Sequence, residues 1–435
     1  MRAVILIAGA GGMYCGSCLR DNRLAARLRA DGRDVVLVPL YTPIRTDEND
    51  VSTATVYYGG LGVYLQQRGG AWGRALGALG GVLDRPWLLR MLGRFAGRTR
   101  PETLGALTVS VLRGPSGTLR PHLERLIDGL KRLEPSVVHL PNLMFVGMAG
   151  ELRRRLEVPV VCSLSGEDIF LDALLEPHRG QALELIARGA ADVELFLAPT
   201  RYYAGHAAVH FGLPTDRIEF VPLGVSVDDL PPREEPPKPP FVVAYMGRIC
   251  PEKGLAELTN ALLLLRDAGR DVRVRAAGYL SPAERPYLQQ VEATLVARSA
   301  RAAFEYLGEV SREQKLALLA SAHVLCVPAT YREAKGLYVL ESLASGVPVV
   351  QPRHGSFPEL VEETGGGILY DATGPAALAD ALSAMMDADA ARTEYGRRGQ
   401  AAVREQFSDR AMATQTWAQY TRLVGGEGMS RGASL

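Results

Sequence analysis

A proline-rich stretch in the middle of the chain limits the possible folds more than any other feature of the sequence. Residues 231–240 read Pro-Pro-Arg-Glu-Glu-Pro-Pro-Lys-Pro-Pro. Proline lacks the N–H group that helix interiors and inner strands need, so this stretch can form neither. Such a composition is typical of a linker. The sequence therefore predicts a break at 231–240, with a folded domain on each side.

Short apolar runs alternate with helical stretches on both sides of this linker. Strands are expected near 4–8, 35–39, 136–140, 158–163, 195–199 and 218–222, and then near 241–246, 272–277, 324–328 and 347–350. Runs that are apolar throughout indicate strands covered on both faces, as in a parallel sheet. We therefore predict an α/β protein with two doubly wound, Rossmann-like domains, 1–230 and 241–405, and a ligand cleft between them.

Size and composition narrow the class of protein. A length of 435 residues suits two domains better than one core, and the net charge of +1 gives no reason to expect nucleic acid as a partner. No apolar run reaches the roughly 18 residues that would cross a bilayer. Five cysteines, an odd number, argue against a disulfide framework. A reducing, cytoplasmic location is the expectation.

The loop 247–254 carries two cations directly after an expected strand. It reads Gly-Arg-Ile-Cys-Pro-Glu-Lys-Gly, so Arg248 and Lys253 lie between glycines that let the backbone approach a ligand. In open α/β sheets, ligands bind at this end of the strands. Two cations there could neutralise a departing diphosphate. Taken alone, the loop could equally be an ordinary solvated one.

A second loop in the same half carries carboxylates. Glu333 and Glu341 stand eight positions apart, and Gly336 between them opens an apolar run that reads as a helix ending at Gly346. The N–H groups at a helix start suit a phosphate, and flanking carboxylates can accept hydrogen bonds from sugar hydroxyl groups. Two glutamates at this spacing also occur by chance, but together with the loop 247–254 they favour a sugar-nucleotide site.

These motifs together resemble the GT-B glycosyltransferases of family 4. The shared pattern is Gly-Arg-x4-Lys-Gly at 247–254, Glu-x7-Glu at 333–341, Ala-x-Gly-x-Pro-Val-Val at 344–350 and Pro-Glu at 358–359. The resemblance covers nearly the whole chain and is strongest over 241–370. It implies a retaining, metal-independent and cofactor-free transfer of a sugar from a nucleotide sugar to an acceptor hydroxyl group. It also implies that a helix in 406–435 crosses back to the first domain.

The resemblance assigns roles to individual residues. It implies that Arg248 and Lys253 hold the donor diphosphate and that Glu333 contacts the transferred sugar, which makes these three the catalytic candidates. The implied donor-binding positions are Gly11, Gly12, Val310, Gly336, Leu337 and Glu341. Among them, Glu341 would accept hydrogen bonds from the ribose.

This chain departs from the family pattern at two places. Ala334-Lys335 stands where Gly-Phe is common, so Lys335 adds a cation near the sugar and could alter the choice of donor. Ser165 stands where the family often has a histidine near the reacting sugar, and a hydroxyl group cannot act as a proton acceptor in its place. Either Glu167 or Asp168 substitutes on this acceptor side, or the acceptor proton passes directly to the departing phosphate, which the family pattern favours.

A basic stretch in the first half is a candidate for contact with an anionic acceptor or a membrane surface. Residues 85–100 contain several arginines and no acid, with Arg90, Arg94 and Arg98 on one face of an expected helix. A core-facing helix with a solvated basic stripe is the competing interpretation. This stretch suggests a lipid-linked or phosphorylated acceptor and a peripheral position at the inner membrane face.

Cys15 and Cys18 form a C-x-x-C pair at an expected helix start, where a thiol pKa is lowered. Small residues packed near the cleft, a redox or thiolate role and a metal site all remain open for this pair. His354, which follows an expected strand, is a candidate for lining the cleft.

Other functions fit less well. Gly9-x-Gly11 begins a dinucleotide-binding pattern, but Tyr14 stands where the third glycine belongs and no acid ends the second strand, which disfavours an oxidoreductase. A non-catalytic sugar-nucleotide-binding protein, a phosphorylase or an epimerase could share the fold. Release of nucleoside diphosphate from a sugar nucleotide would distinguish a transferase from a binding protein.

Overall fold

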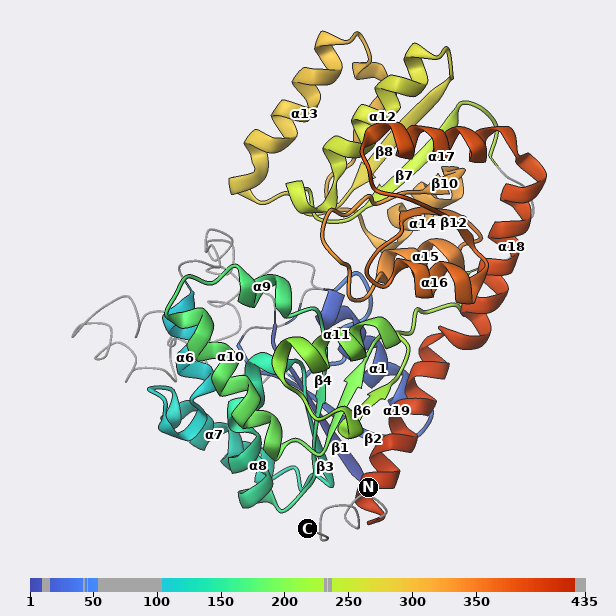
Figure 1. The fold of residues 1–435 in the computed structure, drawn as a ribbon. Coiled ribbons are helices and arrows are strands. Elements are labelled where there is room, and N and C mark those ends of the chain that lie inside the picture. Colours follow the sequence, from blue (N-terminus) through green and yellow to red (C-terminus); the bar gives the residue numbers. More distant parts are fainter. Residues whose placement is uncertain are drawn as a thin grey trace. The chain divides into compact units, whose positions relative to one another are not determined.

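The computed structural model in Figure 1 describes residues 1–9, 16–41, 44, 46–53, 104–230, 233 and 237–426. The chain divides into two compact units, Met1–Gly224 with Asp409–Leu435 and Val225–Ser408. Each unit contains, within the described residues, a six-stranded parallel sheet covered by helices. The predicted α/β class with two doubly wound domains is confirmed, while the cleft between them stays a prediction.

The sheet of the first unit has the strand order β2-β1-β3-β4-β5-β6. Its strands are β1 Arg2–Ile7, β2 Asp34–Pro39, β3 Val137–Leu140, β4 Val160–Ser163, β5 Leu195–Ala198 and β6 Ile218–Phe220. All pairs are parallel, for example Ile5 opposite Leu37 and His139 opposite Val161. The middle strands are buried throughout, as their apolar sequences require. The strand order reverses between β1 and β3.

Helices on both faces complete the first unit. They are α1 Gly16–Ala30, α6 Gly105–Leu112, α7 Arg120–Lys131, α8 Ala149–Leu156, α9 Asp168–Asp172, α10 His178–Gly189, α11 Arg201–Phe211 and α19 Asp409–Val424. The helix α19 comes from the end of the chain and packs beside α1 (Figure 1). Its Met412, Ala413 and Tyr420 belong to the same hydrophobic core as β1 and α1.

The sheet of the second unit has the order β12-β11-β10-β7-β8-β9. Its strands are β7 Phe241–Met246, β8 Val272–Ala277, β9 Phe304–Tyr306, β10 Val324–Leu325, β11 Val349–Pro352 and β12 Gly367–Tyr370. Its helices are α12 Leu255–Asp267, α13 Arg285–Ala297, α14 Arg312–Ser321, α15 Leu337–Ala344, α16 Phe357–Thr364, α17 Pro375–Asp387 and α18 Asp389–Gln406. The chain leaves β7 toward β8 and later returns to β10 on the other side, so the strand order reverses between β7 and β10.

Two expected strands of the second unit differ in their bounds, and local backbone hydrogen bonding explains both differences. The strand expected over 324–328 ends at Leu325, because Pro328 has no N–H group for a ladder and Ala329 turns back to the Val327 carbonyl. The strand expected over 347–350 starts at Val349. Val347 instead donates to the Ser342 carbonyl and closes the end of α15.

The passage between the units does not coincide with the proline-rich stretch. The division falls between Gly224 and Val225, so the described residues of this stretch, 233 and 237–240, belong to the second unit. Arg233, the described residue within its first half, donates from Nη2 to the Ala322 carbonyl at 2.7 Å. The chain re-enters the first unit at Asp409, where α19 begins.

Candidate functional site

The candidate donor site lies at the carboxyl ends of β7 and β10. The loop with Arg248 and Lys253 follows β7, and the loop with Glu333 follows β10. These strands are parallel neighbours, so both loops leave the sheet at the same edge. The strand order reverses between them, and open α/β sheets bind ligands at such a reversal.

The structure brings Lys253 and Glu333 into direct contact. The Lys253 Nζ lies 2.6 Å from Oε2 of Glu333, and the two residues are only 8% and 5% exposed. The hydroxyl groups of Tyr331 and Tyr338 donate to the same oxygen at 2.9 and 3.2 Å. Burial of Glu333 acts to raise its pKa, but the attraction of Lys253 and these hydrogen bonds outweigh burial and lower the pKa to about 2. The carboxylate therefore remains charged at neutral pH.

Arg248 adds a second cation beside this pair. Its side chain is exposed and makes no hydrogen bond to any residue that the structure describes. Desolvation by the surrounding groups acts to lower the pKa of Arg248, but nearby Cys250, Tyr331, Glu252 and Glu333 outweigh it and raise the pKa. The guanidinium therefore stays charged and can bind an anion.

Gly336 shapes the start of α15. Its φ of +64° is a left-handed conformation, and a Cβ there would come within 2.4 Å of Leu360 Cδ1. Any other residue would be strained at this φ and its Cβ would clash with Leu360, so the position requires glycine. Among the residues that the structure describes, no side chain caps the start of α15, and its first N–H groups, near Leu337, point out of the helix end. This end suits a phosphate.

Glu341 has a partner that the sequence did not predict. The Lys315 Nζ on α14 lies 3.0 Å from Glu341 Oε1, and both side chains are largely buried. No local pattern connects two residues that lie on different helices, so sequence reasoning had no signal for Lys315. Val310 comes after β9 and directly before Ser311, which caps α14. Val310 thus lies on the loop that leads into the helix of Lys315.

The loop after β11 packs against the Glu333 segment. The Ser356 N–H donates to the Glu333 carbonyl at 2.8 Å. Gly355 has a φ of +62°, and a Cβ there would lie 2.6 Å from the Glu333 nitrogen. His354, the cleft candidate, therefore stands next to the donor loop. Burial lowers the pKa of His354.

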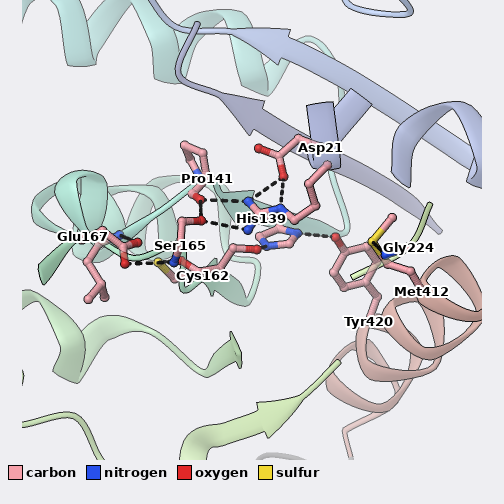
Figure 2. Close-up of polar contacts among 12 residues, drawn as sticks. Asp21, His139, Pro141, Cys162, Ser165, Glu167, Gly224, Met412 and Tyr420 are labelled. Carbon is pink, nitrogen blue, oxygen red and sulfur yellow. Dashed lines mark hydrogen bonds and ion pairs between the residues drawn. The ribbon is translucent and has the colours of Figure 1, made fainter. Parts of the chain in front are cut away.

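In the first unit, Ser165 belongs to a buried network around Arg20 that also includes Asp21 and Pro141; Figure 2 labels Ser165, Asp21 and Pro141. The Arg20 guanidinium donates to Ser165 Oγ at 2.8 Å, to the Pro141 carbonyl at 3.0 Å and to Asp21 Oδ1 at 2.7 Å. Arg20 is 5% exposed and Asp21 is 1% exposed. Ser165 thus acts as an acceptor for a buried arginine. Sequence reasoning missed Arg20, which lies 145 positions from Ser165.

Glu167 and Asp168 have different surroundings. Glu167 accepts from the backbone N–H groups of Leu143 and Ser165 at 3.2 and 2.9 Å, which fixes two loops. Asp168 Oδ2 lies 3.2 Å from His206 Nε2 on α11. Of the two acids, Glu167 therefore acts as a backbone clamp, whereas Asp168 is paired with an imidazole that the sequence did not suggest.

A second set of buried contacts joins α19 to the strands β3 and β4. His139 Nδ1 lies 2.5 Å from the Tyr420 hydroxyl group, and Nε2 lies 2.8 Å from Ser163 Oγ (Figure 2). Burial, with a further contribution from Arg20, lowers the pKa of His139 to about 3. The ring is therefore neutral at physiological pH, and one of its nitrogens donates while the other accepts.

Several predicted residues fall in parts of the chain that the structure does not describe. These are Gly11, Gly12, Arg90 and Arg94, the whole stretch 85–100, and Cys15. Cys18 is described and is 2% exposed within the core of the first unit. Within the described residues, the helices are all too short or too polar to cross a membrane.

Family models match both halves of the chain. The model described as Glycosyltransferase Family 4 covers residues 91–229, and the model described as Glycosyl transferases group 1 covers residues 226–402. The boundary between the two matches falls close to the division between the structural units.

Curated relatives carry glycosyltransferase names. A D-inositol 3-phosphate glycosyltransferase of Pseudarthrobacter chlorophenolicus is 30% identical over 335 residues, 70% of this chain and 77% of that protein. The enzyme of the same name from Corynebacterium efficiens is 33% identical over 232 residues, but the match spans only 50% of this chain and 54% of that one. A phosphatidyl-myo-inositol mannosyltransferase of Mycobacterium leprae is 32% identical over 44% of this chain and 50% of that protein. The chain thus spans about half the length of several of these relatives.

A solved structure shares the fold along nearly the whole chain. Anabaena Alr3699/HepE, in complex with UDP, superposes with a TM-score of 0.66 over 97% of this chain and 100% of that one, at 15% identity. At this identity the likeness concerns the fold alone. Together, the two family models, the relatives and the shared fold place this chain among the group 1, family 4 glycosyltransferases of the GT-B fold.

Proposed function

We propose that this chain transfers a sugar from a nucleotide sugar to an acceptor hydroxyl group, with retention of the anomeric configuration and without a metal or cofactor. One observation carries the proposal: the buried Lys253–Glu333 pair lies beside the exposed guanidinium of Arg248 at the strand-order reversal. Two cations and one ionised carboxylate in one place suit a diphosphate joined to a sugar.

The chemistry needs charge stabilisation more than a nucleophile. In the proposed front-face displacement, the bond from the anomeric carbon to the diphosphate oxygen breaks, and the acceptor oxygen bonds to the same face of that carbon. The acceptor proton passes to the departing phosphate oxygen. Arg248, Lys253 and the start of α15 would stabilise the negative charge that develops on the diphosphate. Glu333 would orient the sugar, and Glu341 would bind the ribose.

The donor can be identified by binding. A thermal-shift screen against UDP-, GDP- and ADP-sugars should raise the melting temperature for one nucleotide class, because a ligand stabilises the state that binds it. UDP is the first candidate, since the Anabaena protein of the same fold binds UDP. Slow release of nucleoside diphosphate from the stabilising donor would support a transferase. Binding with no turnover, with or without acceptors, would favour the non-catalytic binding protein.

The acceptor is proposed to be anionic or lipid-linked. Relatives with names that include inositol 3-phosphate and phosphatidyl-myo-inositol support this class. A glycan acceptor remains the alternative. Product analysis with myo-inositol phosphate, phosphatidylinositol and neutral oligosaccharides would distinguish these classes.

An anionic or lipid-linked acceptor would fit a particular location. We propose that the chain acts in the cytoplasm and contacts the membrane surface through residues 85–100. Flotation with anionic and neutral liposomes tests it. Binding only to anionic vesicles, lost when Arg90 and Arg94 are changed to glutamate, is expected. Equal flotation with both kinds of vesicle would contradict membrane contact through this basic stretch.

A further inference from the structure

The two carboxylate oxygens of Glu333 have unequal sets of partners. Oε2 accepts from Lys253 Nζ at 2.6 Å, from the Tyr331 hydroxyl group at 2.9 Å and from the Tyr338 hydroxyl group at 3.2 Å. Within the described part of the chain, Oε1 accepts only from the Lys335 N–H, at 3.3 Å. That distance is long for an N–H···O bond, so Oε1 keeps most of its capacity to accept.

The same two tyrosines also hold the cation. The Lys253 Nζ lies 5.0 Å from the ring centroid of Tyr331 and 4.8 Å from that of Tyr338. At these distances an ammonium group is attracted to an aromatic face. Tyr331 comes from the loop after β10, whereas Tyr338 lies in the first turn of α15. The carboxylate and the ammonium are therefore held by the same two side chains, which reach them from different elements.

The proposed function places conflicting demands on Lys253. To neutralise a diphosphate, its ammonium group has to turn part of its charge and hydrogen-bonding capacity away from Glu333. A buried carboxylate that loses its only ion-pair partner is strongly destabilised. Glu333 therefore needs other donors that remain when Lys253 engages the donor.

We propose that Tyr331 and Tyr338 are positioning residues of the donor site, an assignment that rests on the proposed function. Their hydroxyl groups keep Oε2 of Glu333 hydrogen-bonded while Lys253 engages the diphosphate. Oε1 thereby stays available to accept a hydrogen bond from the transferred sugar. The tyrosines act through Lys253 and Glu333 and do not themselves touch the reacting atoms.

A double-mutant cycle with Lys253 tests this assignment. The variants are Tyr331→Phe, Tyr338→Phe and their combination, each in the wild-type and Lys253→Met backgrounds, and the probes are UDP, GDP and ADP in titration calorimetry. In the wild-type background, the double tyrosine variant should bind the preferred diphosphate about tenfold more weakly, because Lys253 can leave Glu333 only at a higher cost. In the Lys253→Met background, the same change should alter affinity by less than about twofold, because no lysine has to be released.

A merely structural role gives a different result. If the tyrosines only support the fold, the loss of affinity is the same in both backgrounds, and that outcome overturns the assignment. Tyr395→Phe, a half-buried tyrosine on α18, is the matched control for the chemical change. Should the combined variant fail to fold, the single Tyr331→Phe variant, which lacks one oxygen atom, gives the same comparison.

The pH profile of donor hydrolysis gives a second readout. The charged and titratable groups that face Glu333 are Lys253, Lys335, Arg248 and the two tyrosines. Loss of the hydroxyl donors raises the pKa of Glu333 from about 2. The acid limb of kcat/KM should therefore move to higher pH in the tyrosine variants and stay in place in Tyr395→Phe. An unmoved acid limb would count against the assignment.

The experiments distinguish failure of the proposed function from failure of the tyrosine assignment. A wild-type chain that binds none of the diphosphates and none of their sugar nucleotides overturns the proposed function, and the tyrosine assignment falls with it. A wild-type chain that binds and hydrolyses a donor, with tyrosine variants that behave like Tyr395→Phe, overturns the tyrosine assignment alone.

Discussion

Each structural unit buries a cation–carboxylate pair at the carboxyl edge of its sheet, yet the two pairs differ in the residues beside them: Arg20 and Asp21 lie among buried groups, whereas Lys253 and Glu333 lie beside the exposed Arg248. In the first unit, Arg20 donates to Asp21, to Ser165 and to a backbone carbonyl. In the second unit, Lys253 faces a carboxylate with one weakly engaged oxygen. Burial of an ion pair therefore does not by itself indicate a functional site. The proposal of a donor site in the second unit therefore depends on the exposed cation beside the pair, Arg248.

The largest effect is expected in the first unit, on stability. Arg20→Ala leaves the Asp21 carboxylate buried without its guanidinium partner, so the free energy of unfolding should fall by about 3–5 kcal/mol. Scanning calorimetry, which can resolve separate transitions of the two units, measures this change. Arg154→Ala, which breaks the exposed pair with Glu151, is the control and should have no measurable effect. Equal stability of the two variants would mean that the Arg20 network is not a structural clamp.

The second-largest effect is expected in the second unit and concerns enzymatic activity. Lys253→Ala should cost about 3 kcal/mol of transition-state stabilisation, as the loss of one preorganised stabilising group does, or on the order of a hundredfold in kcat. Donor hydrolysis and transfer assays measure it. Lys238→Ala, which removes an exposed lysine from the same unit, is the control. Near-normal turnover of the Lys253 variant would contradict the role of this lysine.

The pH dependence of stability should include a contribution from the buried His139 of the first unit. His139 in the folded chain has a pKa of about 3, below the ordinary value of 6.5, so the unfolded chain takes up a proton that the folded chain excludes. This contribution to stability is complete above about pH 7 and decreases as the pH falls, by about 2 kcal/mol between pH 7 and pH 5. His139→Gln should flatten this slope in urea-unfolding experiments at several pH values. A slope as steep as that of the wild type would show that another group is responsible.

The smallest effect is expected at Glu341, on donor affinity. Glu341→Ala should raise the donor dissociation constant about tenfold, the loss of one hydrogen bond to a charged group, with little change in kcat. Lys315→Met should produce a weaker effect in the same direction, because Lys315 orients the Glu341 carboxylate. Titration with the preferred nucleoside diphosphate measures both. An unchanged dissociation constant in Glu341→Ala would refute contact with the ribose.

Much of the second unit could be predicted because its signals are local. The helix α15 starts after Gly336 and is followed by Gly346, whose φ of +71° matches the expected left-handed stop. Pro375 stands at the first position of α17, as expected from its fixed φ and missing N–H group. The strands β7 and β8 have the expected bounds because both are apolar or alternating runs bounded by turns.

The partners of the site residues could not be predicted in the same way. Lys315 meets Glu341 across two helices, and Tyr331 and Tyr338 converge on one oxygen of Glu333 from a loop and a helix. Tyr420 reaches His139 over 281 positions of sequence. Such contacts depend on side-chain directions after the elements have packed, and no periodic pattern records them.

Sequence patterns alone predict most of the strands and helices, although not β9 and β12, and they predict which loops after the strands carry the charged residues. These features follow from hydrophobic periodicity and from the backbone limits of glycine and proline, which act over a few residues. Sequence patterns do not predict which Glu333 oxygen has most of the hydrogen-bond donors, or that Ser165 accepts from the buried Arg20; these follow from the packed fold. Those outcomes depend on packing, because a hydrogen bond forms only where the packed atoms meet at the right distance and angle, and Lys253 and Arg20 reach their partners from 80 and 145 positions away.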